Sequence, residues 1–139
     1  MILTRTDTEA TISLPDDLYW QDEAWSPVVQ SAERSLTGAL ILQEATREAG
    51  RPITLSGYSG QGGQGGAITK AKADLLLEWA AVACLPMTLE RLGTTYTVRW
   101  NHANGSPVSL NPVIFWVNIG EDADDDPWYS PTIRLLTHA

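Results

Sequence analysis

Residues 51–84 decide the fold class of this chain, and they read RPITLSGYSGQGGQGGAITKAKADLLLEWAAVAC. An expected strand at residues 51–58 comes first, a Gly/Gln segment follows, and a helical segment comes last. Residues 60–65 have the spacing Gly-x-Gly-x-x-Gly, which joins a strand to a helix in dinucleotide-binding sheets. The stretch therefore belongs either to a parallel nucleotide-binding sheet or to a loop in an antiparallel fold.

The strand before the glycine segment favours the antiparallel fold. Ile53 and Leu55 alternate with polar residues, whereas a strand buried on both faces of a parallel sheet is apolar almost throughout. A dinucleotide fold also needs further βαβ units, but the segments after the helix look like antiparallel hairpins without a second crossover helix. We therefore predict that residues 60–65 bind no nucleotide. They are expected to form a low-complexity loop that is mobile in the free subunit and becomes ordered against a neighbouring one.

The strongest helical signal in the chain covers residues 69–84. Leu75, Trp79 and Val82 are spaced i, i+4, i+7, which places them on one face of a helix. Thr69 is a suitable N-cap, and Pro86 prevents the helix from continuing. We predict that this apolar stripe packs on a sheet.

The rest of the chain is predicted to be β-structure. Apolar and polar residues alternate in several expected strands, namely residues 11–14, 28–45 as a hairpin turning near residues 33–35, and 94–100. Residues 106–112, 113–119 and 132–138 are expected to continue the sheet. Asn104-Gly105 is a pair that closes hairpins, and residues 15–27 are expected to be a loop with exposed Tyr19, Trp20 and Trp25. One helix within a run of hairpins predicts a single α+β, mainly β domain over residues 1–139: an antiparallel β-sandwich or split barrel with one flanking α-helix.

The composition argues against several classes of partner. The net charge is −8 and the isoelectric point is about 4.5. Nucleic acids and anionic membrane surfaces both select clustered Lys and Arg, so neither is an expected partner. The N-terminus lacks the pattern of a signal peptide, and no stretch approaches the ~18 apolar residues of a membrane span. We expect a soluble protein made in a cytosol, with its one cysteine, Cys84, buried at the end of the helix.

No residue pattern predicts catalysis, a cofactor or a metal site. His102 and His138 have no metal-ligand spacing, there is no Gly-x-Ser-x-Gly nucleophile motif, and the acidic segment 121–126 does not match a calcium loop. A small enzyme would need a concave pocket with perturbed titratable groups. Trp20, Trp25 and Trp116 leave a carbohydrate-binding module open as an alternative, although we prefer a core or a subunit interface for them.

Four segments together resemble a known family: SLTGALILQEA at 35–45, GRPITLSG at 50–57, TKAKADLLLEWAAVA at 69–83 and LERLGTTYTVRW at 89–100. Their order is similar to that in small tail-tip proteins of long-tailed bacteriophages, and most of all to the N-terminal ring domain of distal tail proteins. The resemblance covers residues 28–137. It implies the tail-tube plan, a β-sandwich or split barrel with one flanking helix, and it implies neither catalysis nor a cofactor.

The resemblance also implies a place in the virion. Such domains assemble side by side into a hexameric ring below the tail tube, and the ring joins the tube to the baseplate hub and the receptor-binding proteins. The implied partners are further copies of this chain and other tail proteins (tube, tape measure and hub), at the tail tip of a virion made in the host cytoplasm. Distal tail proteins usually carry a second, peripheral domain, for which we expect no room in these 139 residues, so a tail-completion or other minor tail protein is an alternative.

The ring hypothesis assigns particular residues to subunit contacts. We expect the hairpin 28–45, the strand 51–58 and the loop 59–67 at or near these contacts, because a glycine-rich loop can become ordered where a partner supplies hydrogen bonds. An acidic chain also needs cations where identical copies meet, and arginine is suited to pairing with a neighbour's carboxylates. The predicted interface residues are Arg34, Arg47, Arg51, Gly60, Gln61, Gln64 and Lys70.

Overall fold

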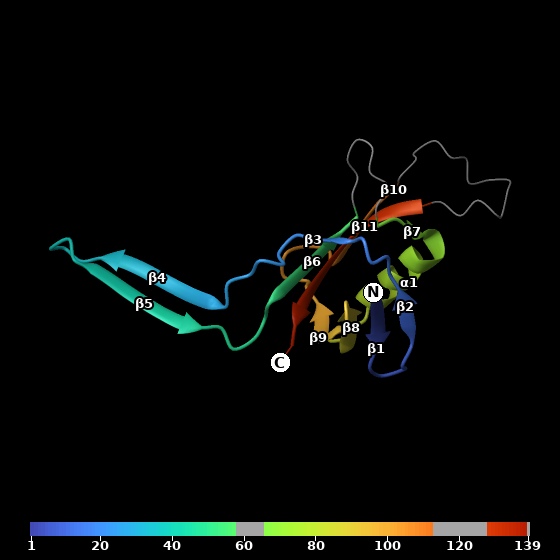
Figure 1. Ribbon diagram of the computed structural model, residues 1–139, viewed down its shortest axis with the longest axis horizontal. Helices are drawn as coiled ribbons and strands as arrows, with labels where there is room; N and C mark the ends of the chain where they lie inside the picture. Colours follow the sequence, from blue (N-terminus) through green and yellow to red (C-terminus); the bar gives the residue numbers. More distant parts are fainter. Residues whose placement is uncertain (58–65, 113–127, 139) are drawn as a thin grey trace.

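Eleven strands and one helix account for the part of the chain that the computed structural model describes, residues 1–57, 66–112 and 128–138 (Figure 1). In chain order they are β1 (Ile2–Arg5), β2 (Thr11–Ser13), β3 (Tyr19–Trp20), β4 (Val28–Arg34), β5 (Leu40–Thr46), β6 (Pro52–Ser56), β7 (Ile68–Thr69), α1 (Lys70–Ala80), β8 (Met87–Arg91), β9 (Thr94–Trp100), β10 (Val108–Pro112) and β11 (Trp128–Thr137).

Nine of these strands form one sheet, in which the order is β2-β1-β8-β9-β11-β6-β3 and in which β10 and β7 also pair with β11. The ten-residue strand β11 therefore pairs with four others along its length. Every pairing is antiparallel, and over the described residues the sheet is not closed into a barrel. The predicted α+β, mainly β class is confirmed, with a sandwich-like architecture, and the parallel sheet of a dinucleotide-binding fold is excluded.

The core forms on one face of this sheet because the buried side chains occur at alternate positions and in register. Leu55 lies opposite Ile133, and Ile53 lies opposite Leu135, which also faces Trp100 on the next strand. Residues two apart on a strand project from the same face, so these rows form a continuous apolar surface. Together with buried side chains of the helix and of loops, they make up the core, whose members are Leu3, Ile12, Leu14, Leu18, Trp20, Ile53, Leu55, Ile68, Ala73, Leu76, Trp79, Leu85, Met87, Leu89, Val98, Trp100, Val108, Ile133 and Leu135.

The helix packs on this core through a different stripe from the predicted one. α1 buries Ala73, Leu76 and Trp79, and it contacts β7, β10 and β11. Leu75 and Val82 remain 42% and 38% exposed, so the predicted stripe was right for Trp79 and wrong for its other two members. Because this segment has three consecutive leucines, hydrophobicity alone does not determine which side of the helix faces the sheet. In the structure, contact with the sheet buries the middle leucine, Leu76.

The helix is also shorter than predicted. Thr69 is its N-cap as expected, without a side-chain capping hydrogen bond, but the helix ends at Ala80. Cys84 has a φ of 54° and is exposed, and the reversal at this residue places Leu85 in the core. The expectation that Cys84 is buried was therefore wrong.

Four strands, β1, β3, β7 and β8, were not predicted. β8 and β9 form a hairpin across Leu92-Gly93, whose φ angles of 48° and 79° are those of a type I′ turn. Asn104-Gly105 closes no hairpin between β9 and β10, because β10 pairs with β11 instead. Trp20 lies in β3 and is buried, whereas the prediction placed it in an exposed loop. The strand predicted at residues 113–119 lies outside the described residues.

The described structure brings the two ends of the glycine segment together. A Cβ atom on Gly66 would lie 3.1 Å from the Cα of Gly57 and 2.8 Å from the Cδ2 of Leu18, and Gly66 has a φ of 74°. Position 66 therefore requires glycine, both for its backbone angle and because two segments of the chain approach closely there. Residues 58–65 themselves lie outside the described residues, so the absence of nucleotide binding stays a prediction.

Candidate assembly surface

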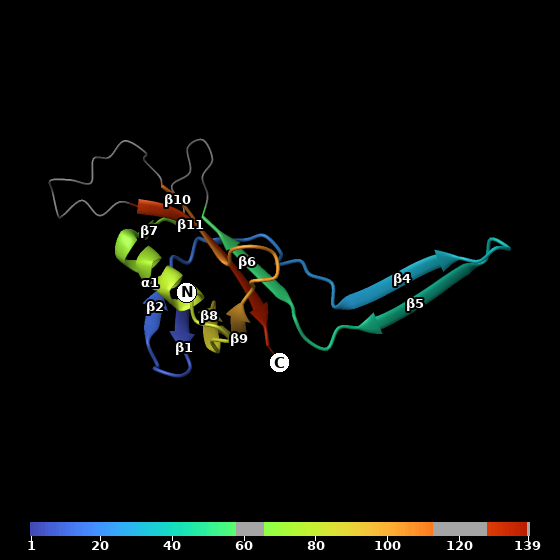
Figure 2. The ribbon, with the colours of Figure 1, turned by 180° about the vertical axis from the view of Figure 1, so that it is seen from behind.

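One part of the chain projects away from the sheet and its core. β4 and β5 form a separate two-stranded ribbon, paired from Val28 opposite Thr46 to Arg34 opposite Leu40. Figures 1 and 2 show this ribbon extending from one end of the body, while α1 lies near the other end. We name residues 28–46 the arm. The predicted hairpin is thus confirmed.

The arm turns at residues 35–39 and not at residues 33–35. The amide of Gly38 donates to the carbonyl of Ser35, and the amide of Ser35 donates to the carbonyl of Ala39, both over 2.9 Å. Gly38 has a φ of 82°, as the last position of a three-residue hairpin loop requires. Leu36 therefore lies at the tip of the arm, where its exposure reaches 108%.

Every residue of β4 and β5 is exposed, although several of them are large and apolar. Residues directly opposite one another in an antiparallel pair share a face. One face therefore carries Val28, Ala32, Leu40 and Leu42, which we name the arm's apolar face, and the other carries Val29, Ile41 and Ala45. Leu40 and Leu42 remain 57% and 50% exposed. An isolated two-stranded hairpin is marginally stable in water, so this ribbon is suited to contact with a partner.

Stacked arginine and tryptophan side chains lie where the arm joins the body. The guanidinium carbon of Arg51 lies 4.6 Å from the ring centroid of Trp20 and 5.8 Å from that of Trp25, and the guanidinium carbon of Arg47 lies 5.6 Å from Trp25. Tyr96 meets Trp20 edge to face at 5.7 Å. Such cation–π contacts contribute on the order of 0.5–2 kcal/mol each. They fix the position of the two chain segments that enter and leave the arm.

Hydrogen bonds add to this attachment. The segment between β3 and the arm is bound to β6, because Asp22 accepts hydrogen bonds from the amide of Thr54 (2.8 Å) and from its hydroxyl (3.1 Å). At the base of the arm, the amide of Arg47 donates to the carbonyl of Pro27 over 2.7 Å. The two ends of the arm are therefore adjacent, and the arm leaves the body in a defined direction.

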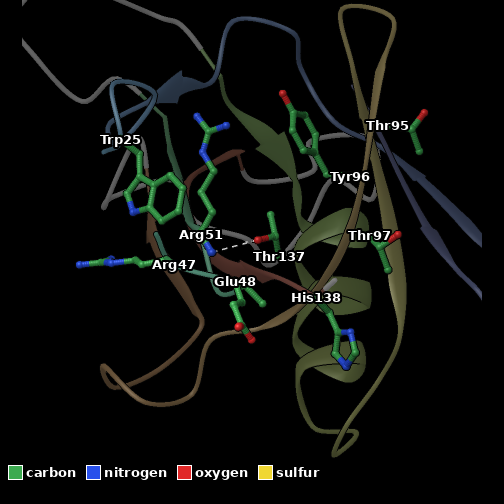
Figure 3. A pocket seen from close by; sticks show the side chains of 10 residues that line it. Trp25, Arg47, Glu48, Arg51, Thr95, Tyr96, Thr97, Thr137 and His138 are labelled. Carbon is green, nitrogen blue, oxygen red and sulfur yellow. Dashed lines mark hydrogen bonds between the residues drawn. The ribbon is translucent and has the colours of Figure 1, made fainter. Parts of the chain in front are cut away.

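A surface pocket of about 310 Å³ lies beside this attachment (Figure 3). Figure 3 shows the side chain of Arg51 between Trp25 and Tyr96, and the backbone amide of Arg51 donates to the Oγ1 of Thr137 (2.9 Å). Two guanidinium groups, one carboxylate and several hydroxyl groups make this a polar pocket that can contact an acidic or hydroxyl-bearing partner. The lining residues are Trp25, Arg47, Glu48, Ala49, Arg51, Thr95, Tyr96, Thr97, Thr137 and His138.

The structure brings two of the predicted interface residues together. Arg47 and Arg51 share the ring of Trp25. Arg34 lies near the tip of the arm, where its Nη1 donates to a turn carbonyl over 3.1 Å. Lys70 begins α1 near the opposite end of the body (Figure 1). The predicted residues Gly60, Gln61 and Gln64 lie outside the described residues.

Two members of the stacked cluster, Tyr96 and Arg91, were not predicted from the sequence. The guanidinium carbon of Arg91 lies 5.3 Å from the ring centroid of Trp20, and no pattern in the sequence indicates this contact. The burial of Trp20 did have a signal in the sequence, because Leu18 and Trp20 are apolar residues at the spacing of one strand face. Both are buried in the structure.

A second arginine contact lies away from the arm, on the surface of the body. Arg5 donates two hydrogen bonds to Asp7, from Nε to Oδ1 over 3.0 Å and from Nη2 to Oδ2 over 2.7 Å. These bonds lower the pKa of Asp7 and raise the pKa of Arg5. Arg5 also lies 5.6 Å from the ring of Trp79, on the helix.

Metal-binding groups and membrane-spanning helices are both absent from residues 1–57, 66–112 and 128–138. Within them, no three His, Cys, Asp or Glu side chains gather as a metal-binding group, and the acidic segment 121–126 lies outside them. None of the helices in this part of the chain is long and apolar enough to cross a membrane. The predicted absence of a metal site stays a prediction.

Comparison of the chain with protein-family models, with curated proteins and with solved structures finds no match. A functional hypothesis therefore depends on the geometry of the arm and its attachment, together with the resemblance seen in the sequence.

Proposed function

We propose that this protein is a structural subunit of a bacteriophage tail tip that assembles with copies of itself into a ring, expected to be hexameric. The ring would join the tail tube to the baseplate hub and the receptor-binding proteins, as the resemblance implies. The proposal assigns the protein no catalytic role, cofactor or metal. Its surfaces serve contact with further copies of the chain and with other tail proteins.

The arm is the observation that carries this proposal. A ribbon with both faces exposed leaves unpaired strand edges and apolar side chains in water, and natural proteins avoid such edges unless a partner covers them. Six large apolar residues of the arm are exposed: Val28, Leu40 and Leu42 on the apolar face, Val29 and Ile41 on the opposite face, and Leu36 at the tip. Exposed apolar side chains gathered on one element are typical of a surface that a partner covers. A subunit that buries its arm against a neighbour removes this surface from water.

The charges near the arm also support assembly. The chain carries a net charge of −8, so identical copies repel one another at long range. Arg34 on the arm, with Arg47 and Arg51 at its attachment, supplies positive groups where two copies would meet. A neighbour's carboxylates can pair with these guanidinium groups, and pairing at an interface offsets the repulsion.

A carbohydrate-binding module is the second candidate, and the pocket beside the arm is the observation that favours it. Trp25 and Tyr96 flank hydroxyl-bearing and charged residues there (Figure 3), and sugars stack on exposed aromatic rings. The ring of Trp25, however, already carries two guanidinium groups within 5.8 Å of its centroid. Little of that ring is available for a sugar, so we rank this candidate below the assembly subunit.

The test of the proposed function is the size and shape of the particle that the purified chain forms. We expect native mass spectrometry to give one closed oligomer, six chains of 15.2 kDa each, and negative-stain images to give rings. Inactivating the coding sequence in a phage that carries it should give particles with defective tail tips. Rings that are absent at every concentration, together with intact tails in the inactivated phage, would contradict the proposal.

A further inference from the structure

A second exposed apolar surface lies on the helix. Ala71, Leu75 and Val82 occupy the side of α1 and its following turn that faces away from the core, together with the exposed Glu78. Residues three or four positions apart lie on one face of a helix, which groups Ala71, Leu75 and Glu78. Val82 is exposed in the turn that follows the end of the helix. We name Ala71, Leu75, Glu78 and Val82 the helix outer face. Within the described residues, no element covers this face.

The arm and the helix outer face lie at opposite ends of the molecule. Both views of the ribbon show the arm projecting from one end of the body and α1 near the other (Figures 1 and 2). The arm of one chain therefore cannot reach its own helix, but it can reach the helix of a second copy. A contact between two different surfaces of identical chains is heterologous, and repeating it produces a ring when the rotation closes.

The charges on the arm and on the helix are complementary for one of the two directions in which the arm can lie along the helix. On the arm's apolar face, Arg34 and Glu44 are four positions apart along the ribbon, a separation of roughly 13 Å. Beside the helix outer face, Lys70 and Glu78 are eight residues apart, a separation of roughly 12 Å along the axis, and the exposed Asp74 lies midway between them. Placing Arg34 beside Glu78 therefore places Glu44 beside Lys70. The reverse direction would bring like charges together at both ends.

We propose that the arm of one copy lies along the helix outer face of the next copy, with Leu40 and Leu42 against Leu75 and Val82. This inference rests on the proposed function, because it specifies the contact by which the subunits of the ring join. It commits to a second copy of this chain as the partner of the arm. Arm-to-arm pairing and addition of the arm to a sheet edge are the alternatives that the experiment separates.

The experiment uses two variants of the full chain, each changed on one surface only. The arm variant carries Leu40→Asp and Leu42→Asp, and the helix variant carries Leu75→Asp and Val82→Asp. All four side chains are exposed, so both chains should fold, which circular dichroism and thermal melting verify. The matched control is Leu92→Asp, which places the same charge at an 86% exposed leucine in the β8–β9 turn.

We expect wild type and the Leu92→Asp control to assemble, and each surface variant alone to sediment as a monomer. An equimolar mixture of the two variants should form a 1:1 pair of twice the 15.2 kDa chain mass, because one intact arm and one intact helix remain and the chain of contacts ends there. Analytical ultracentrifugation and native mass spectrometry at high micromolar concentration measure these species.

Several outcomes would overturn the inference. A helix variant that assembles as wild type does would show that the arm binds elsewhere, to another arm or to a sheet edge, while the ring itself could still stand. A mixture that stays monomeric, or wild type that is monomeric throughout, would exclude this contact outright. If the Asp variants fail to fold, charge reversal tests the same contact. Arg34→Glu should weaken association on the order of tenfold, and adding Glu78→Arg in the copy that it contacts should restore association. Unrestored association would refute the pairing.

Discussion

Deleting the arm should not lower the stability of the body. The change replaces residues 28–46 by a Gly-Gly linker between Pro27 and Arg47, whose backbone groups are already hydrogen-bonded over 2.7 Å. No buried core residue of the described structure comes from the arm, so the deletion removes no core packing. Shortening a connection of about 19 residues to 2 lowers its closure entropy by at most about 2 kcal/mol. We therefore expect a free energy of unfolding between the wild-type value and about 2 kcal/mol above it.

Tryptophan fluorescence in a urea titration measures this free energy. None of the six tryptophans lies within residues 28–46, so the deletion leaves the signal of folding intact. The slope of the unfolding free energy with urea should also stay the same, since it follows the surface exposed on unfolding. Both chains are titrated at several dilutions, because assembly of the wild type would add a concentration-dependent term to its stability.

A fall of more than about 2 kcal/mol in the dilute, monomeric chain would refute this reasoning. Burying one large apolar side chain contributes about 1.5–3 kcal/mol, so such a loss would mean that the arm packs on its own body in solution. The surface assigned to a neighbour would then be covered within one chain, and the main support for the assembly hypothesis would be lost.

Four further predictions concern single side chains. Trp79→Ala should cost roughly 3–5 kcal/mol of unfolding free energy and Leu75→Ala less than about 1 kcal/mol, because only the tryptophan is buried. Equal losses in urea titrations would contradict the orientation of the helix on the core. Gly66→Ala should cost at least about 1–2 kcal/mol because its φ is 74°, and an unchanged melting temperature would contradict that conformation. Leu92→Asn should gain about 0.5 kcal/mol in the same assay, since the exposed leucine has a φ of 48° that asparagine tolerates better, and a loss would argue against the turn. Hydrogen bonds from the arginine two residues earlier lower the pKa of Asp7, so NMR should show this carboxyl titrating below the usual value of about 3.9. Its contribution to stability is complete above that value and is lost as the pH falls through the folded pKa. The unfolding free energies of wild type and Asp7→Asn should therefore converge in acid.

The fold class could be predicted because the decisive signals are local. Ile53 and Leu55 alternate with polar neighbours, and this pattern indicated an antiparallel strand with one buried face, which the register against β11 confirms. The hairpin of the arm followed from the same alternation. The helix was predicted because apolar residues recur in its segment at helical spacing, although its rotation and its end were not predicted correctly.

The strand pairings could not be predicted, because they join segments that are distant in the sequence. β1 pairs with β8 across more than half of the chain, and β11 collects four partners. Short strands such as β3 and β7 form only because β6 and β11 offer an edge to them. The contacts of Arg51 with the rings of Trp20 and Trp25 likewise depend on segments that the sheet brings together.

The sequence alone determined the mainly β class, the acidic character and the existence of a hairpin at residues 28–45, because residue type and period of alternation are local properties of a chain. Only the tertiary structure decided that this hairpin covers no core. The pattern of alternating apolar residues is the same in a strand that packs on a core and in a strand that is exposed to water. Which of the two occurs depends on what the rest of the chain places beside the strand. The projection of the arm, and with it the candidate assembly surface, is therefore a property of the folded molecule.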